Sequence, residues 1–235
     1  MQQAAEGNRL RNRLRPLQHL DAGQILVHEI FASVQGESSH AGRPCTFVRT
    51  TACNLRCSYC DTRHAFARGR PMAAEAVLAE VCRLGVALVE VTGGEPLLQA
   101  PVLPLMARMC DLGYTVMCET SGSISVADLD PRVIKVLDLK TPSSGEHRAN
   151  LLSNLYHLTA RDEVKFVLGS RDDYLWAREL ICREKLADRC TVLMGPVWDA
   201  LPPAELVAWM LADRLPVRLQ LQLHKFIWDP KATGV

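Results

Sequence analysis

Three cysteines in one short stretch are the residues most able to do chemistry. Cys53, Cys57 and Cys60 occur in the segment Cys-Asn-Leu-Arg-Cys-Ser-Tyr-Cys. Three thiolates on one loop can hold three irons of a cubic 4Fe–4S cluster, and no fourth cysteine follows in the run. The fourth iron then keeps an open coordination position for a small molecule. The segment therefore predicts a reaction centre rather than a structural clip.

A zinc site built from the same cysteines is the main alternative. Structural zinc usually takes four ligands from two paired Cys-x-x-Cys arms. The remaining cysteines are scattered along the chain and offer no second arm: Cys45, Cys82, Cys110, Cys118, Cys182 and Cys190. The spacing favours an iron–sulfur cluster, but on spacing alone a zinc site stays open.

A glycine-containing turn follows a strongly apolar segment. Residues 86–91 are almost entirely apolar, which is typical of a strand buried on both faces, and Thr92-Gly93-Gly94-Glu95-Pro96 comes directly after them. Glycines let the backbone approach a ligand closely, so amides and carbonyls there can pair with the charged end of an amino acid. An ordinary strand-to-helix turn, with Glu95 near a helix start, explains the turn taken alone. Combined with the cysteines, it favours a ligand site.

The elements that must position these residues alternate between strands and helices. We expect strands over 25–31, 46–50, 86–91, 114–120, 133–139, 163–168, 191–197 and 217–227, and helices over 71–84, 97–112, 174–186 and 204–212. Such alternation implies right-handed crossovers and a parallel sheet. At 235 residues the chain is short for a complete eight-fold barrel of about 250. The predicted fold is an α/β, incomplete TIM-type barrel of mostly parallel strands with outer helices.

Composition narrows the classes of partner. A net charge of +1 and 6% aromatic residues argue against nucleic-acid binding and against an anionic membrane surface. No run of eighteen apolar residues is present, so we expect no membrane span. The first residues lack the apolar stretch of a secretory signal, and nine cysteines without such a signal indicate a reducing compartment. We therefore expect a cytoplasmic protein.

Residues 1–22 differ from the rest of the chain and predict a partly ordered leader. Arg9, Arg11, Arg13 and Arg15 alternate with Asn and Leu before a proline. A solvated arm explains this pattern better than an arm that contacts RNA, because four arginines are few. Since no internal repeat or interdomain linker follows, we expect residues 23–235 to form a single domain.

The cysteine triplet and the 92–96 turn together resemble the radical S-adenosylmethionine (SAM) superfamily. The resemblance implies that the methionine amino and carboxylate groups of SAM chelate the open iron. It also implies that one electron from the reduced cluster frees a 5′-deoxyadenosyl radical, which removes a hydrogen atom from the substrate.

Longer segments resemble the 7-carboxy-7-deazaguanine synthase family of that superfamily, from about residue 25 to residue 228. They are Phe31–Glu37, Gly42–Arg49, Cys60–Thr62, Glu119–Gly122, Asp138–Gly145 and Gln222–Lys225. The resemblance implies a carbon–nitrogen lyase that converts 6-carboxy-5,6,7,8-tetrahydropterin into 7-carboxy-7-deazaguanine with loss of ammonia. It places the chain in the biosynthesis of queuosine and other 7-deazapurines, a tRNA modification pathway, with SAM regenerated after each turnover.

The resemblance also implies the roles of site residues. Cys53, Cys57 and Cys60 would bind the cluster, and Thr62 would bind Mg²⁺ through its hydroxyl oxygen. Contacts to SAM are implied for Tyr59, Asp61, Gly94, Glu95, Ser121, Asp138, Leu139 and Lys140. Contacts to the pterin are implied for Val34, Gln35, Gly36, Glu37, Arg49, Thr92 and His224. Arg49 suits the pterin carboxylate. Without the resemblance, Arg49 reads equally well as a surface ion pair, and His224 reads as a core histidine.

Two departures from the family pattern stand out. Ala52 precedes Cys53 where glycine is common, and the tail 228–235, which in the family closes over the substrate, looks different. The implied partners are a flavodoxin- or ferredoxin-type electron donor and a second copy of the chain in a homodimer. Two other functions stay open: a radical SAM activase of a partner enzyme, and a zinc-stabilised or electron-carrying binding protein.

Overall fold

The computed structural model describes residues 2–235 and builds one mixed sheet from all strands of that range. The strands are β1 (Gln24–Val34), β2 (Pro44–Thr50), β3 (Arg70–Ala73), β4 (Leu88–Gly93), β5 (Thr115–Thr120), β6 (Ile134–Leu139), β7 (Glu163–Leu168), β8 (Thr191–Pro196) and β9 (Arg218–Leu219). Their order in the sheet is β3-β1-β2-β4-β5-β6-β7-β8-β9. Strand β1 pairs antiparallel with both β2 and β3. Every other neighbouring pair, from β2–β4 to β8–β9, is parallel.

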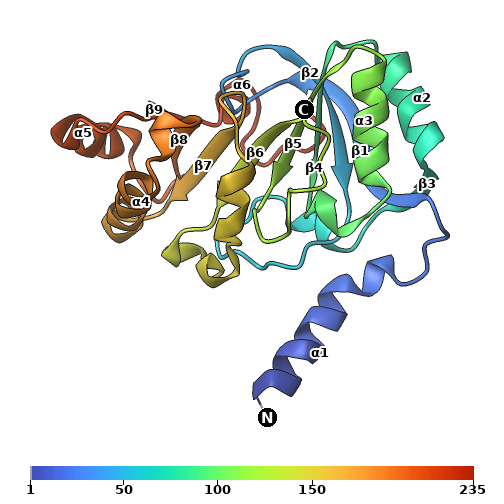
Figure 1. Cartoon of the computed structure of the whole chain (residues 1–235), viewed down its shortest axis with the longest axis horizontal. Helices are drawn as coiled ribbons and strands as arrows, with labels where there is room; N and C mark the ends of the chain where they lie inside the picture. The colour runs from blue at the N-terminus through green and yellow to red at the C-terminus, as the bar shows by residue number, and fades with distance from the viewer. Residues whose placement is uncertain (1) are drawn as a thin grey trace.

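Helices cover the outer face of this sheet (Figure 1). The α-helices are α1 (Gln2–Leu14), α2 (Ala74–Leu84), α3 (Val102–Asp111), α4 (Arg171–Glu184), α5 (Pro203–Asp213) and α6 (His224–Ile227). Short 3₁₀ helices are η1 (Arg15–Leu17), η2 (Arg63–Phe66), η3 (Pro96–Leu98), η4 (Pro142–Ser144), η5 (His147–Ala149), η6 (Leu152–His157) and η7 (Leu186–Asp188). The sheet is not closed, so the predicted incomplete TIM-type barrel with outer helices is confirmed.

Alternation along the strands gives the sheet two different faces. On the outer face, Val89 and Val91 of β4 pack into the core that the apolar sides of α2–α5 complete. On the inner face, a smaller apolar cluster comprises Cys45, Phe47, Leu88, Met117, Ile134 and Val136. Toward the carboxyl ends of the strands the inner positions become polar: Arg49, Glu90, Thr92, Glu119, Asp138 and Lys165. The inner face thus has an apolar base and a polar upper layer, which is where ligands bind in parallel sheets.

Two expected elements are wrong. The strand expected over 217–227 shrinks to β9, and His224 lies in α6, because the backbone after β9 turns toward the loop that follows β1. The helix expected from Pro71 begins at Ala74, because Pro71 belongs to β3 and pairs with Leu26 of β1. Proline suits this position because β3 is an edge strand.

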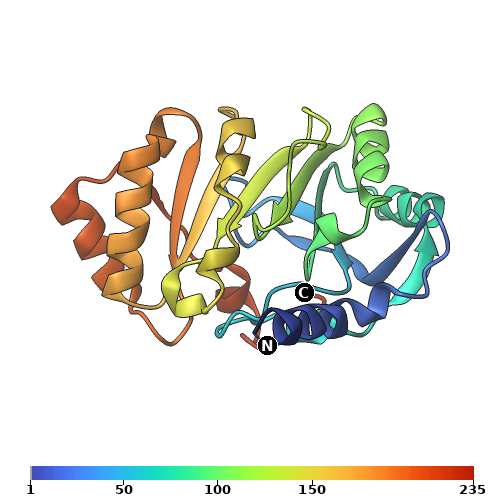
Figure 2. The same ribbon diagram turned by 60° about the horizontal axis from the view of Figure 1, so that its bottom comes forward.

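The leader region forms α1 and η1 ahead of the sheet. Figure 1 shows α1 projecting past the sheet, and Figure 2 shows it on the same side as the C-terminus and the loop after β2. The Arg13 guanidinium at the end of α1 donates to the Asn54 carbonyl at 2.6 Å. In residues 2–235, no helix has both the length and the apolar character required to cross a bilayer.

Candidate active site

The cluster loop, residues 52–60, leaves the carboxyl end of β2 and carries the three cysteines. Cys53 is buried and the other two are half-buried. The Leu55 amide donates to the Cys53 sulfur at 3.4 Å, a contact that stabilises a metal-bound thiolate. Burial raises the pKa of Cys53 and of Cys57 to about 11, so their thiolates need a cationic metal centre beside them. Three sulfurs on one loop fit the donor set of a 4Fe–4S cluster.

Three arginines, the arginine collar, donate to backbone carbonyls of this loop. The bonds run from Arg13 to Asn54 (2.6 Å), from Arg56 to Cys53 (2.7 Å) and from Arg63 to Ser58 (2.6 Å). These guanidiniums hold the loop from three separate segments: α1, the loop itself and η2. They also place positive charge beside a group of thiolates, which favours the anionic form of a cluster.

A second support comes from the turn after β6. Ser58 donates through its amide to the Ser144 carbonyl at 3.0 Å and through its hydroxyl to the Ser143 carbonyl at 2.7 Å. Asp173, fully buried in α4, accepts hydrogen bonds from the Ser143 amide (2.9 Å), the Ser143 hydroxyl and the Gly169 amide (2.8 Å). The cluster loop therefore rests on a turn that a buried carboxylate fixes.

Ala52 adopts a left-handed conformation, with φ of 79°. Its amide donates to the Ala65 carbonyl at 3.0 Å, and its carbonyl accepts from the Glu95 amide at 2.8 Å, so both neighbours fix this backbone. A side chain in this region costs about 1–2 kcal/mol, which glycine avoids. This conformation explains why glycine suits the position before the first cysteine.

Replacing Ala52 by glycine is expected to raise the free energy of unfolding by about 0.5–1 kcal/mol, since the relief of strain exceeds the added chain entropy of glycine. Denaturant unfolding of the wild type and of Ala52→Gly measures the difference. The matched control is Ala107→Gly within α3, for which the same chemical change should lower stability by about as much. A loss of stability in Ala52→Gly would contradict the strain argument.

The turn after β4 packs directly beneath the cluster loop. A Cβ atom on Gly94 would lie 2.1 Å from the Ala52 carbonyl oxygen and 2.9 Å from Cys53 Cβ. Glu95 is fully buried, and its carboxylate accepts from Leu97 N (3.2 Å), Thr120 Oγ1 (2.8 Å) and both the amide and hydroxyl of Ser121 (2.9 and 2.5 Å). These four bonds use the lone pairs of the carboxylate, so its side chain fixes the turn and leaves backbone groups to face a ligand.

The segment at the end of β6 combines polar and apolar roles. Lys140 Nζ lies 2.9 Å from Asp138 Oδ2, and the other oxygen, Asp138 Oδ1, is buried without a hydrogen-bond partner among the described residues. The Leu139 side chain packs into the outer core, so only its backbone can line a ligand. Nearby, Tyr59 of the cluster loop donates to the Val167 carbonyl at 3.3 Å, and burial raises its pKa to about 12.

The loop after β1 docks onto the C-terminal segment. The Leu223 amide donates to the Gly36 carbonyl at 2.9 Å, and Gln222 Nε2 donates to Glu37 Oε1 at 2.9 Å. A Cβ on Gly36 would lie 2.2 Å from His224 Nδ1, so only glycine fits beneath this ring. The structure thus brings His224 to the expected pterin residues, although from a helix rather than a strand.

The Gln35 side chain forms hydrogen bonds to other residues of the protein. Its amide group donates to Glu90, and its oxygen accepts from the Glu37 amide at 3.0 Å. Val34 ends β1 just before it and is half-buried. Gln35 therefore shapes the loop that carries Gly36 and Glu37.

Arg49 lies on β2 beside Thr92 of β4, in direct register with it. Its Nε donates to Glu29 Oε1 of β1 at 2.8 Å. The Thr62 hydroxyl, at the start of η2, donates to Asp61 Oδ1 at 3.0 Å, and Lys225 holds the other Asp61 oxygen at 3.0 Å.

Lys165 of β7 is a residue that the sequence interpretation missed. It is buried and contacts three carboxylates: Glu37 (2.6 Å), Glu119 and Asp138 (3.4 Å). Burial alone would lower the pKa of Lys165, but Glu119 and Glu37 raise it well above its ordinary value, so it is charged. A lysine inside the otherwise apolar segment Val-Lys-Phe-Val-Leu was the available signal.

Comparison with known proteins identifies relatives of this chain. Residues 47–140 match the family model described as the radical SAM superfamily. The chain is 45% identical to the 7-carboxy-7-deazaguanine synthase of Chlorobaculum tepidum, over 89% of this chain and 96% of that protein. It is also 45% identical to the synthase of Koribacter versatilis, over 89% of this chain and 99% of that protein.

The chain belongs to the 7-carboxy-7-deazaguanine synthase family. The fold agrees, because QueE from Escherichia coli superposes with a TM-score of 0.70, at 24% identity, over 86% of this chain and 95% of that one. The chain is therefore a radical SAM enzyme, and its cofactors are a 4Fe–4S cluster and SAM. Membership of this family also favours the synthase over the activase and the zinc-stabilised binding protein.

Glu90 of β4 is a buried carboxyl group on the inner face of the sheet. Burial and the nearby Glu119 raise the pKa of Glu90 to about 8. Its unfolded value is near 4.5, so between about pH 4.5 and 8 the folded chain holds a proton that the unfolded chain has lost. Stability from this group is therefore lost as the pH rises through that window.

Replacing Glu90 by glutamine is expected to flatten this part of the pH profile, because Gln keeps an acceptor for Gln35 but does not ionise. Unfolding midpoints measured from pH 5 to pH 9 should fall more steeply for the wild type than for Glu90→Gln. Glu205→Gln on α5, where the carboxylate is exposed, is the matched control and should follow the wild type. Parallel profiles for wild type and Glu90→Gln would contradict the assignment.

Proposed function

We propose that the chain converts 6-carboxy-5,6,7,8-tetrahydropterin into 7-carboxy-7-deazaguanine with loss of ammonia, on the path to queuosine and related deazapurines. The observation that carries this proposal is the convergence of Glu37, Gln222 and Lys165 through hydrogen bonds of 2.6–2.9 Å. These contacts join the loop after β1, the C-terminal segment and β7, and Lys165 also contacts Glu119, which accepts from Thr92 of β4 at 3.2 Å. Because Gln222 Nε2 also lies 3.4 Å from Asp61, the residue after Cys60, this polar surface lies next to the cluster loop.

The residues of this surface match the chemistry of a carboxypterin. Arg49 offers a guanidinium for the carboxylate, which has to compete with the ion pair to Glu29. Glu37 and Glu119 offer acceptors for ring N–H groups, and the Lys165 ammonium contacts both carboxylates. His224 sits over Gly36 and closes the surface from the C-terminal side.

The cofactor residues have a separate task. Cys53, Cys57 and Cys60 would hold the cluster, whose reduction in the presence of SAM supplies a carbon-centred radical able to abstract a hydrogen atom. Gly94 and the Glu95-fixed turn would bind the amino acid end of SAM. Tyr59, Asp61, Ser121 and the segment Asp138–Lys140 would line the remainder, with the unpartnered Asp138 oxygen as an acceptor.

Magnesium is part of the proposal. The Thr62 hydroxyl sits beside the Asp61 carboxylate, an oxygen environment that suits a hard cation. Substrate carboxylate and water would supply further oxygens. Thr62 would thereby orient the carboxylate that Arg49 would also bind.

The experiment is an anaerobic assay of reconstituted protein with reductant, SAM, Mg²⁺ and the carboxypterin, followed by mass spectrometry of the product. The wild type should form the deazaguanine, and Arg49→Met should raise KM by about 100-fold, because a charged hydrogen-bond pair is lost. Arg83→Met on exposed α2 is the matched control and should behave like the wild type. If the wild type cleaves SAM reductively but forms no deazaguanine, the substrate assignment fails.

A low-potential carrier of the flavodoxin or ferredoxin type is the proposed electron donor. The support is the arginine collar around the cluster loop, together with the exposed Arg9, Arg11 and Arg15 of the leader region. Such a surface fits a carrier with an acidic face, and association should slow as salt rises. Reduction rates of the cluster by flavodoxin, measured at 50 and 300 mM salt, check this expectation.

We also propose a single radical SAM domain over residues 23–235 behind the leader 1–22, a cytoplasmic location, and a homodimer. Nine free cysteines support a reducing compartment. Exposed Phe226 and Ile227 on α6 offer apolar surface for self-association. Sedimentation velocity of the wild type and of a Phe226→Ser variant tests the dimer.

A further inference from the structure

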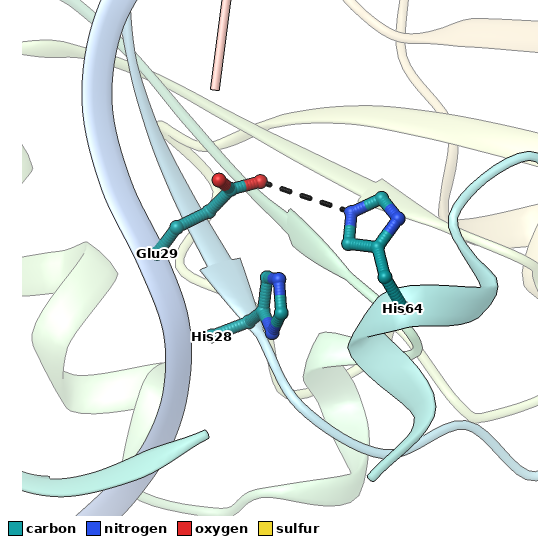
Figure 3. A group of neighbouring side chains, drawn as sticks. All are labelled: His28, Glu29 and His64. Carbon is teal, nitrogen blue, oxygen red and sulfur yellow. Dashed lines mark ion pairs between the residues drawn. The ribbon is translucent and has the colours of Figure 1, made fainter. Parts of the chain in front are cut away.

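Two histidines and one carboxylate outside the cofactor and pterin residues share one small space. His28 and Glu29 lie on β1, and His64 lies on η2 (Figure 3). Each residue offers a ligand atom within 4.8 Å of the others. Two imidazoles and a carboxylate form a donor set that binds zinc and related late divalent cations.

The side chains of His28 and Glu29 are each oriented by a hydrogen bond to a further group, as is usual for metal ligands. His28 Nδ1 lies 2.6 Å from the Arg68 carbonyl. A carbonyl only accepts, so Nδ1 carries the proton, and the lone pair of the neutral ring lies on Nε2. Glu29 Oε1 accepts a hydrogen bond from the Arg49 guanidinium, and Glu29 Oε2 is left for another partner.

His64 supplies an independent observation. Its Nε2 is buried and has no hydrogen-bond partner within residues 2–235. The same atom faces Glu29 Oε1 at 4.0 Å, a distance too long for a hydrogen bond (Figure 3). A buried imidazole nitrogen without a partner is costly, and a shared cation would satisfy it.

We propose that His28, Glu29 and His64 form a binding site for one late divalent cation of the zinc class. In a tetrahedral zinc site with N and O ligands, donor atoms lie about 3.3 Å apart. Since the three donor atoms already lie within 4.8 Å of one another, they must approach by at most about 1.5 Å. Water completes the coordination.

This site differs in chemistry from the magnesium site proposed at Thr62. Imidazole nitrogens favour zinc, whereas a hydroxyl and carboxylates favour magnesium. Arg49 opposes a cation here through its charge, so Arg49→Met should bind zinc more tightly than the wild type. The inference does not depend on the substrate proposed above.

The experiment uses the full chain with its cluster loaded under anaerobic conditions, so that the three cluster sulfurs are occupied. Excess Mg²⁺ in every sample saturates hard oxygen sites. The protein is dialysed against a zinc buffer series, retained zinc and iron are measured by mass spectrometry, and the zinc environment is measured by X-ray absorption. The wild type should hold about one zinc, with nitrogen and oxygen neighbours at about 2.0–2.1 Å.

The decisive variant is His64→Phe, because it keeps a ring and removes no hydrogen bond. It should weaken zinc binding by at least about 10-fold, while its iron content and melting temperature match those of the wild type. His157→Phe, at an exposed position, is the matched control and should bind zinc like the wild type. Sulfur neighbours near 2.3 Å, no zinc retention, or equal affinities of the two variants would each overturn the proposal.

Discussion

Replacing Lys165 by methionine is expected to abolish turnover and to lower the free energy of unfolding by about 3–5 kcal/mol, the usual cost of stranding buried charge. The lysine side chain is only 6% exposed and contacts Glu37, Glu119 and Asp138. Without its ammonium, three neighbouring carboxylates repel one another, and the pKa values of Glu37 and Asp138, which Lys165 lowers, would rise. Some of them would take up protons and lose the charge that we propose for pterin and SAM binding.

The measurement for Lys165→Met combines denaturant unfolding with steady-state kinetics below the unfolding transition. Lys135→Met is the matched control, because Lys135 is equally buried and paired with Asp162 at 3.3 Å, but lies three residues before Asp138, the β6 residue in register with Lys165. It should also lose stability, yet keep kcat where it is folded. Near-normal kcat/KM in folded Lys165→Met would show that the lysine acts on stability alone.

Adding one methyl group at Gly94 is expected to disrupt the cluster loop. In Gly94→Ala the new Cβ would meet the Ala52 carbonyl oxygen at 2.1 Å and the Ala52 carbonyl carbon at 2.5 Å. These are backbone atoms that two hydrogen bonds fix, so no side-chain rotation relieves the contact. Overpacking of this kind costs about 1–3 kcal/mol, and it moves the backbone beside Cys53.

We expect Gly94→Ala to retain less than half of the wild-type iron after anaerobic reconstitution and to lose SAM cleavage. Iron and sulfide content, and the yield of 5′-deoxyadenosine in the absence of the carboxypterin, when SAM is not regenerated, measure both effects. Gly7→Ala adds the same methyl group on α1, where no atom of the described residues lies within 4 Å apart from its chain neighbours and the helix backbone, and should keep full iron and activity. Full iron content in Gly94→Ala would show that the loop tolerates the displacement.

The elements most accessible to sequence analysis were the buried parallel strands. Runs such as residues 86–91 can only be buried on two faces, and the helices between them show the expected period. The last expected strand ends early for a physical reason: after Gln220, whose amide still donates to Met194 of β8, the backbone leaves the edge of the sheet. Its backbone instead donates to Gly36 across the inner face, a contact between residues far apart in the sequence.

The residues of the candidate site also differ in whether the sequence alone reveals them. Residues in short, unusual segments, such as the cysteines and Gly36, could be found from the sequence and the family resemblance. Lys165, Glu90 and Asp173 could not, because each is a single charged residue whose role depends on partners from other strands or loops. Glu95 was expected to touch SAM, but its carboxylate has four partners within the protein.

The docking of Gly36 against Leu223 and His224 has a consequence for the order of events during synthesis. The loop at Gly36 leaves the ribosome early, but its partner is made about 190 residues later, which takes on the order of 10–40 s at ordinary translation rates. The cysteine loop is therefore complete long before the C-terminal segment arrives. A nascent chain could acquire iron while its substrate surface is still open, and catalysis would begin only after release of the finished polypeptide.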